Sequence, residues 1–182
     1  MQRFQLKRDD GDISICHWSA NGKSVLHWAH ANGFNAQTYD PLLAPLAGDF
    51  DVYAADARGH GFSTLAADPA HYPGWTQYRN DMIDVVEHLC DKAGEKIWLG
   101  GHSMGGCASV MAAAKRPDLV AGMVLVDPVI VPRRERVLAR MKFRNGGGFA
   151  LALNAAKRRA DWPDAETVIK AYTGRGAFQT WQ

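Results

Sequence analysis

The stretch KIWLGGHSMGGCASVMAAAKR at residues 96–116 decides the fold of this 182-residue chain. Residues 96–100 predict a strand, and residues 104–116 predict a helix of small side chains that Pro117 ends. The residues between them read GGHSMGG and contain the pattern Gly-x-Ser-x-Gly, centred on Ser103. The sequence therefore predicts a sharp turn from strand to helix, with Ser103 at the turn.

A turn of this kind suits a serine that acts as a nucleophile. A serine hydroxyl reacts when it is exposed, held in place and met by a base, and a tight turn exposes it in a strained backbone conformation. Gly101 and Gly105 fit the turn because a side chain at either position would collide with the neighbouring strand or helix. Met104 opens the helix, so its N–H has no partner within the helix and can donate to an anion that forms on a substrate carbonyl.

Strands alternate with helices on both sides of this turn. Apolar runs at residues 24–29 and 51–55 predict buried strands, residues 122–126 predict a further strand, and an alternating pattern between residues 4 and 17 predicts a hairpin. Residues 76–93 predict a helix, because their apolar side chains recur at helical spacing on one stripe. This alternation predicts a mostly parallel sheet with helices on both faces.

The loop after the strand at 24–29 is expected to supply a second backbone donor. This loop reads HANGFN at residues 30–35, and Gly33 allows its backbone to approach a substrate closely. Phe34 N–H is the candidate donor, with Asn35 as its nearest competitor. Together with the Met104 N–H it would stabilise a tetrahedral oxyanion.

Four stretches, in order, resemble the α/β-hydrolase superfamily: HANGF at residues 30–34, DARGHGFS at 56–63, the serine turn, and LVDP at 125–128. The resemblance implies a capped serine hydrolase that cleaves an ester, lactone, amide or related acyl bond through an acyl-serine intermediate. It leaves open carbon–carbon bond cleavage and a cofactor-free peroxidase-type reaction. Haloalkane-dehalogenase and epoxide-hydrolase chemistry is disfavoured, because those relatives carry Asp where this chain has Ser103.

The composition changes near residue 131, where a second structural unit is expected to begin. Residues 1–130 hold 10 Lys+Arg against 15 Asp+Glu, whereas residues 131–182 hold 11 against 4. The resemblance implies that residues 1–130 are the N-terminal part of an α/β-hydrolase core with an incomplete sheet. It implies that residues 131–182 are the start of a helical cap, in which residues 132–143 and 165–173 predict helices.

A serine hydrolase of this kind also needs a carboxylate and a histidine base, in the chain order serine, acid, histidine. All seven histidines precede Ser103, so the histidine and the acid are expected to be missing, although Asp127 is a possible acid. The resemblance then implies a C-terminally truncated member that is itself inactive or nearly so. Its strand at 122–126 would be an unprotected edge, which predicts poor solubility or association. The alternative function is a non-catalytic α/β-hydrolase-like module that binds a small ligand.

Four further side chains are candidates for the substrate pocket, namely Asn35, His102, Trp75 and Phe143. His102 adjoins Ser103 but projects away from it, so a hydrogen-bonding or packing role is favoured over that of a base. The expected partner is a small-molecule acyl substrate, whose identity the sequence does not give. The oligomeric state is also undetermined.

Composition excludes several other classes of protein. A net charge of +2 argues against a nucleic-acid binder, and no apolar run approaches the roughly 20 residues of a membrane span. The charged N-terminus and three widely spaced cysteines suit the reducing cytoplasm. No cofactor and no metal are expected, because the oxyanion donors are backbone groups and no residues have metal-ligand spacing.

Overall fold

The computed structural model of the protein describes residues 1–20, 23–68, 74–130, 157, 159, 161–175 and 179. The chain divides into two compact units, Met1–Ile130 and Val131–Gln182. The first unit contains the serine turn and the loops expected to form a site. The identity of the second unit as part of a cap stays a prediction.

A six-stranded mixed sheet forms the centre of the first unit, with the strand order β1-β2-β4-β3-β5-β6. The strands are β1 (Gln2–Arg8), β2 (Gly11–Trp18), β3 (Val25–Ala29), β4 (Asp51–Ala55), β5 (Ile97–His102) and β6 (Val120–Val126). The hairpin β1–β2 and the pair β2–β4 are antiparallel, and β4, β3, β5 and β6 run parallel. The predicted mostly parallel α/β sheet is therefore confirmed.

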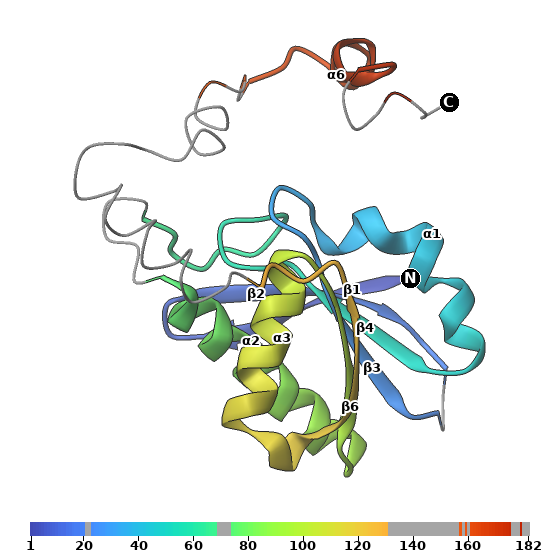
Figure 1. Cartoon of the computed structure of the whole chain (residues 1–182), viewed down its shortest axis with the longest axis vertical. Helices are drawn as coiled ribbons and strands as arrows, with labels where there is room; N and C mark the ends of the chain where they lie inside the picture. The colour runs from blue at the N-terminus through green and yellow to red at the C-terminus, as the bar shows by residue number, and fades with distance from the viewer. Residues whose placement is uncertain are drawn as a thin grey trace. The chain divides into compact units, whose positions relative to one another are not determined.

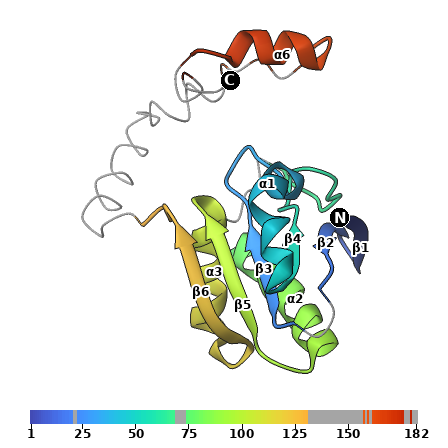
Figure 2. The ribbon, with the colours of Figure 1, turned by 90° about the vertical axis from the view of Figure 1, so that its right-hand side faces the viewer.

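Helices cover both faces of this sheet (Figure 1 and Figure 2). One face packs against α2 (Trp75–Ala93) and α3 (Met104–Lys115). The other packs against three short turns of helix, η1 (Ala36–Tyr39), α1 (Asp40–Leu43) and η2 (Pro45–Gly48). For this segment the sequence predicts a single short helix, over residues 38–46 with its end near Gly48. The structure breaks it into three pieces, because Pro41 and Pro45 each remove a backbone donor at the start of a turn.

The helix α2 forms as its apolar stripe predicts. Met82, Val85 and Leu89 are buried against the sheet, whereas the polar side chains point elsewhere. Gly94 ends the helix in the left-handed conformation at φ 71°, and its N–H donates to the Cys90 carbonyl at 2.8 Å. The helix α2 therefore covers this face of the sheet.

The strand β6 lies at one edge of the sheet and is exposed on both faces. Among the described residues only β5 pairs with it, and Met123, Val124 and Val126 are 41%, 56% and 47% exposed. An apolar edge strand of this kind offers unpaired backbone groups to another strand. The association expected from the sequence stays a prediction.

The second unit contains one described helix, α6 (Ala165–Tyr172), where the sequence predicts a helix over residues 165–173. The Asp164 carboxylate caps it by accepting from the Thr167 N–H at 2.7 Å. The helix predicted over residues 132–143 lies outside the described residues. Of the described helices in either unit, none is both long and apolar enough to pass through a bilayer.

Candidate active site

Ser103 occupies the turn between β5 and α3 in a strained conformation. Its φ is 51° and its ψ −113°, and among the described non-glycine residues only Asp127 shares a positive φ. Such a conformation costs about 1–3 kcal/mol and persists only where the surroundings hold it. The Ser103 N–H donates to the Val126 carbonyl at 3.0 Å, and the Ser103 carbonyl accepts from the Cys107 N–H at 3.2 Å. The turn therefore presents the serine hydroxyl at the end of the strand, as the sequence predicts.

Two glycines allow this turn to close. A Cβ at Gly101 would lie 2.7 Å from the Gly106 nitrogen at the start of α3. A Cβ at Gly105 would collide with the Ala29 carbonyl at the end of β3 and lie 2.7 Å from the Ala29 Cβ. These are the collisions that the sequence predicts, and they show how closely α3 approaches the neighbouring strands.

Replacement of Gly105 by alanine is expected to lower the free energy of unfolding by about 1–3 kcal/mol, because the backbone of β3 must move to admit the methyl group. Gly106→Ala is the matched control, because its Cβ would meet its nearest neighbour, the Pro128 Cβ, at 3.1 Å and α3 gains a better helix former. Urea unfolding of both variants measures the difference. Equal stability of the two would contradict a close contact between Gly105 and β3.

The loop at residues 30–35, called here the oxyanion loop, follows β3 and is held by its backbone donors. The Ala31 N–H donates to the Tyr39 hydroxyl at 3.0 Å, and the Gly33 N–H donates to His60 Nε2 at 3.2 Å. The Phe34 N–H donates to the Ala31 carbonyl at 3.1 Å. Among the described residues the Asn32 N–H has no acceptor.

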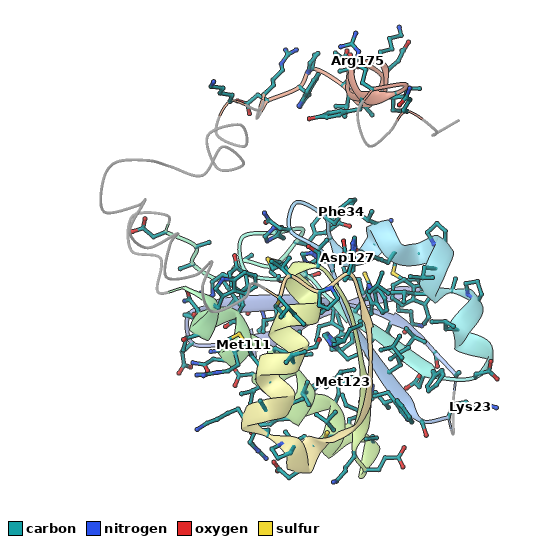
Figure 3. All side chains as sticks on the ribbon, viewed as in Figure 1. Lys23, Phe34, Met111, Met123, Asp127 and Arg175 are labelled. Carbon is teal, nitrogen blue, oxygen red and sulfur yellow. The ribbon has the colours of Figure 1, made fainter. Side chains whose placement is uncertain are left out.

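The N–H of Phe34, the oxyanion donor expected from the sequence, has an acceptor within the loop. Its N–H is engaged in a turn that Gly33 makes possible at φ 81°, so it is not available to a substrate. The competitor Asn35 instead caps η1, where its side chain accepts from the Thr38 N–H at 3.0 Å. Figure 3 places Phe34 and Asp127 at the end of the sheet where the parallel strands finish, and Lys23 at the opposite end.

Two histidines near the loop form hydrogen bonds, His30 to the backbone and His102 to a side chain. The His30 Nδ1 lies 2.8 Å from the Ala31 carbonyl, and its Nε2 accepts from the Ala57 N–H at 2.8 Å. A carbonyl only accepts, so His30 carries its proton on Nδ1 and is neutral. Burial lowers the pKa of His30 further below its ordinary value. His102 lies with its Nδ1 2.8 Å from the Tyr39 hydroxyl, in the hydrogen-bonding role expected of it.

The buried carboxylate of Asp56 connects the segment before η1 to the turn after β4 by hydrogen bonds. It accepts from the Ala36 N–H at 2.8 Å and from the Phe62 N–H at 2.9 Å, and it pairs with Arg3 at 2.9 Å. A Cβ at Gly61 would collide with this carboxylate, so glycine is required at that turn. Asp56 therefore fixes the start of η1 to the turn that follows β4.

Arg58 forms a second buried pair behind the site. Its guanidinium, 4% exposed, donates to Asp81 of α2 through Nε at 2.9 Å and Nη2 at 2.8 Å, and to Asp10 at 2.9 Å. These carboxylates raise the pKa of Arg58, and its hydrogen bond lowers the pKa of Asp10. The loop after β4 is thus joined to α2 and to the hairpin.

An open pocket of about 450 Å³ lies against the serine. It is lined by Asn32, Trp75, Tyr78, Ser103, Met104 and Val129. The predicted residues Ser103, Met104 and Trp75 therefore lie together, whereas Asn35 and His102 do not line this pocket. Asp127 is exposed just beyond β6, and Phe143 lies outside the described residues.

Asn32, Tyr78 and Val129 are pocket residues that the sequence does not indicate as such. The sequence gives one indication that Asn32 is unusual. It is the third residue of the HANG segment, where the loop differs from a more common form that begins His-Gly. Tyr78 is indicated only as part of the apolar stripe of α2, and Val129 carries no signal. Among the described residues, no group of three or more His, Cys, Asp or Glu side chains is placed to hold a metal ion.

Sequence comparison gives one matching family model and relatives that are named as a lipase and a hydrolase. The family model described as serine aminopeptidase, S33 matches residues 20–162. The chain is 33% identical over 135 residues to a monoglyceride lipase of Mus musculus, which covers 71% of this chain and 44% of that protein. It is 37% identical over 119 residues to a 2-(acetamidomethylene)succinate hydrolase of Mesorhizobium japonicum, covering 65% and 41%. The chain thus spans less than half the length of these two relatives.

Solved structures agree on the fold. The crystal structure of a hypothetical protein from Pseudomonas aeruginosa PAO1 has a TM-score of 0.73 at 26% identity, covering 94% of this chain and 58% of that one. The thioesterase domain from the curacin biosynthetic pathway has a TM-score of 0.69 at 20% identity, covering 94% and 60%. The second likeness shows the fold alone.

Proposed function

The chain belongs to the serine aminopeptidase S33 family within the α/β-hydrolase superfamily, and from this premise we propose that Ser103 is the nucleophile of a serine hydrolase. The reaction is the cleavage of an ester, lactone, amide or related acyl bond through an acyl-serine intermediate. The observation that carries the proposal is the strained conformation of Ser103 at the mouth of a pocket that also includes Asn32 and Met104. Strain of this kind concentrates at sites where it serves the chemistry.

Two backbone N–H groups are the proposed oxyanion donors. Met104 begins α3, so its N–H has no partner within the helix. The Asn32 N–H replaces that of Phe34 as the second donor, because it is the one N–H of residues 31–34 without an acceptor among the described residues, and Asn32 lines the pocket of Ser103. Loss of one such donor costs about 3–4 kcal/mol of transition-state stabilisation.

In the proposed reaction the Ser103 oxygen attacks the acyl carbon while its proton passes to a base. The carbonyl π bond breaks, and its electron pair becomes the oxyanion held by the N–H groups of Asn32 and Met104. Collapse of this intermediate breaks the bond to the leaving alcohol or amine, which takes up a proton. Water then attacks the acyl-serine and releases the carboxylic acid.

The histidine base of this mechanism does not follow Ser103 in the 182 residues, and Asp127 is the candidate acid that they contain. We therefore expect slow turnover by this chain, since a site without one member of its triad retains only binding and oxyanion stabilisation. The second candidate function is a non-catalytic module that binds a small ligand in the same pocket.

The proposed substrate is a small molecule with an acyl group. The pocket presents polar and apolar surface in equal measure, with Asn32 and Ser103 beside the side chains of Trp75, Met104 and Val129. Relatives named as a monoglyceride lipase and a 2-(acetamidomethylene)succinate hydrolase support an ester or amide bond as the target. No cofactor is part of the proposal.

A cytoplasmic location is also part of the proposal. Cys16 and Cys90 are buried free thiols, and Cys107 is a partly buried one, which is consistent with a reducing compartment.

The test is covalent labelling of the 182-residue chain by a fluorophosphonate, followed by intact-mass measurement and peptide mapping. We expect one adduct, on Ser103, and none in Ser103→Ala. Added imidazole supplies the absent base, so it should accelerate labelling of the native chain while leaving the variant unlabelled. Labelling that persists in Ser103→Ala would remove Ser103 from the mechanism. An unlabelled native chain that binds an apolar acid would favour the binding module.

A further inference from the structure

One nitrogen of the His60 ring contacts two groups of the oxyanion loop. His60 Nε2 lies 3.2 Å from the Gly33 nitrogen and 3.0 Å from Asn32 Oδ1. The other ring nitrogen, Nδ1, lies 2.9 Å from the Arg58 carbonyl. These contacts place one titratable side chain against the segment that carries the proposed Asn32 donor.

The hydrogen-bonding capacities of these groups make the two contacts of Nε2 mutually exclusive. The Arg58 carbonyl only accepts, so His60 Nδ1 carries a proton and donates. In neutral His60 the Nε2 then has a free lone pair, which accepts from the Gly33 N–H. In protonated His60 the Nε2 carries a proton, which can be donated to Asn32 Oδ1 but leaves the Gly33 N–H facing another donor.

Three ionisable side chains belong to the segments around His60, and the charge of His60 contributes to the lowered pKa of one of them, His30. The His30 ring lies 5.1 Å away between centroids and is buried and neutral. The Arg58 guanidinium is turned to Asp81 and Asp10, and the Asp56 carboxylate is bound to backbone N–H groups and to an arginine. None of these charged groups shares a hydrogen bond with the His60 ring among the described residues.

We propose that His60 is a positioning residue that sets the oxyanion loop through its protonation state. Neutral His60 fixes the Gly33 N–H and so orients the adjoining peptide of Asn32. Protonated His60 releases Gly33 and binds the Asn32 side chain, which reorients that peptide. The inference rests on the proposed function only where it links the loop to the reactivity of Ser103.

The first measurement does not depend on catalysis. In ¹⁵N-labelled chain, the amide signal of Gly33 is expected to shift with pH along the same curve as the His60 ring, and the neutral ring should show the tautomer protonated on Nδ1. In His60→Gln the Gly33 signal should stay constant, because the amide oxygen accepts at every pH. His88→Gln, which replaces a histidine of α2 away from the loop, should keep the native shift. A constant Gly33 signal in the native chain, or a neutral ring protonated on Nε2, would overturn the proposal.

The second measurement is the fluorophosphonate labelling rate of Ser103 as a function of pH. Relative to His60→Gln, we expect the native chain to lose about fivefold in rate on acidification, the factor that corresponds to one exchanged hydrogen bond. His60→Ala should be slow at every pH. Equal pH profiles for the native chain and His60→Gln would overturn the link to reactivity. If no variant is labelled at any pH while the Gly33 signal still titrates, the proposed function fails and the positioning role of His60 stands.

Discussion

Replacement of Asp81 by alanine is expected to lower the free energy of unfolding by about 3–5 kcal/mol. Asp81 is the two-point partner of the Arg58 guanidinium, and both side chains are almost fully buried. Removal of the carboxylate leaves a buried positive charge that, among the described residues, keeps the more exposed Asp10 as its ionic partner and the Ala66 carbonyl as an acceptor. Most of the loss therefore comes from the unpaired charge rather than from a missing attraction.

Asp84→Ala is the matched control for this variant. Asp84 lies one turn further along α2 and also pairs with an arginine, Arg8, but its side chain is 38% exposed. Exposed pairs contribute little, so this variant should change the free energy of unfolding by less than about 1 kcal/mol. Urea denaturation of both variants at neutral pH gives the comparison. Similar losses in the two would show that burial of the Arg58–Asp81 pair does not govern its contribution.

Acidification is expected to destabilise the fold through His27. This side chain of β3 is fully buried, and neither ring nitrogen has a hydrogen-bond partner among the described residues. Burial lowers the pKa of His27 from 6.5 to about 4. Because the folded pKa lies below the unfolded one, unfolding takes up a proton between these values. Stability is therefore complete above pH 6.5 and falls by about 3 kcal/mol on approach to pH 4.

The measurement is urea unfolding of the native chain and of His27→Phe at several pH values between about 7 and 4. His27→Phe removes both buried nitrogens and keeps an aromatic ring, so its stability should fall less steeply with acid. The difference between the two curves isolates His27 from the carboxylates and from His30, which titrate in both proteins. Parallel curves would mean that His27 is not the source of the acid sensitivity.

The sequence predicts those features that depend on neighbours along the chain. The stripe Met82, Val85 and Leu89 predicts α2, because helical spacing alone brings these side chains to one face. The turn at Ser103 is equally local, since Gly101 and Gly105 are needed wherever a strand passes directly into a packed helix. Both features were confirmed for this reason.

The proposed donor differs by two residues from the one the sequence predicts, because this assignment depends on contacts across the fold. Phe34 loses its N–H to a turn within the loop, and Asn32 keeps its own only because Tyr39 and His60 occupy the neighbouring N–H groups. No spacing along the chain indicates those two partners. The sequence likewise does not predict that Arg58 pairs with Asp81, because the two residues are 23 positions apart along the chain.

The exposure of β6 also depends on what lies beside the strand rather than on its own residues. The apolar run at residues 122–126 predicts the strand, and only the resemblance to the hydrolase superfamily implies that it is an unprotected edge. The structure contains this strand at the edge of the sheet and leaves it half uncovered. Apolar composition predicts the strand, whereas burial is decided by neighbours that composition does not specify.

The backbone of Ser103 is tied to this outermost strand, because its N–H donates to the carbonyl of Val126, the last residue of β6. A strand bonded on one side frays more readily than a central one. Opening of that end of β6 would remove one of the two backbone hydrogen bonds that hold Ser103 at its positive φ, the other being the bond from the Cys107 N–H to the Ser103 carbonyl. A strand that paired with the side of β6 left open among the described residues would therefore also stabilise the backbone of the serine, from outside the pocket.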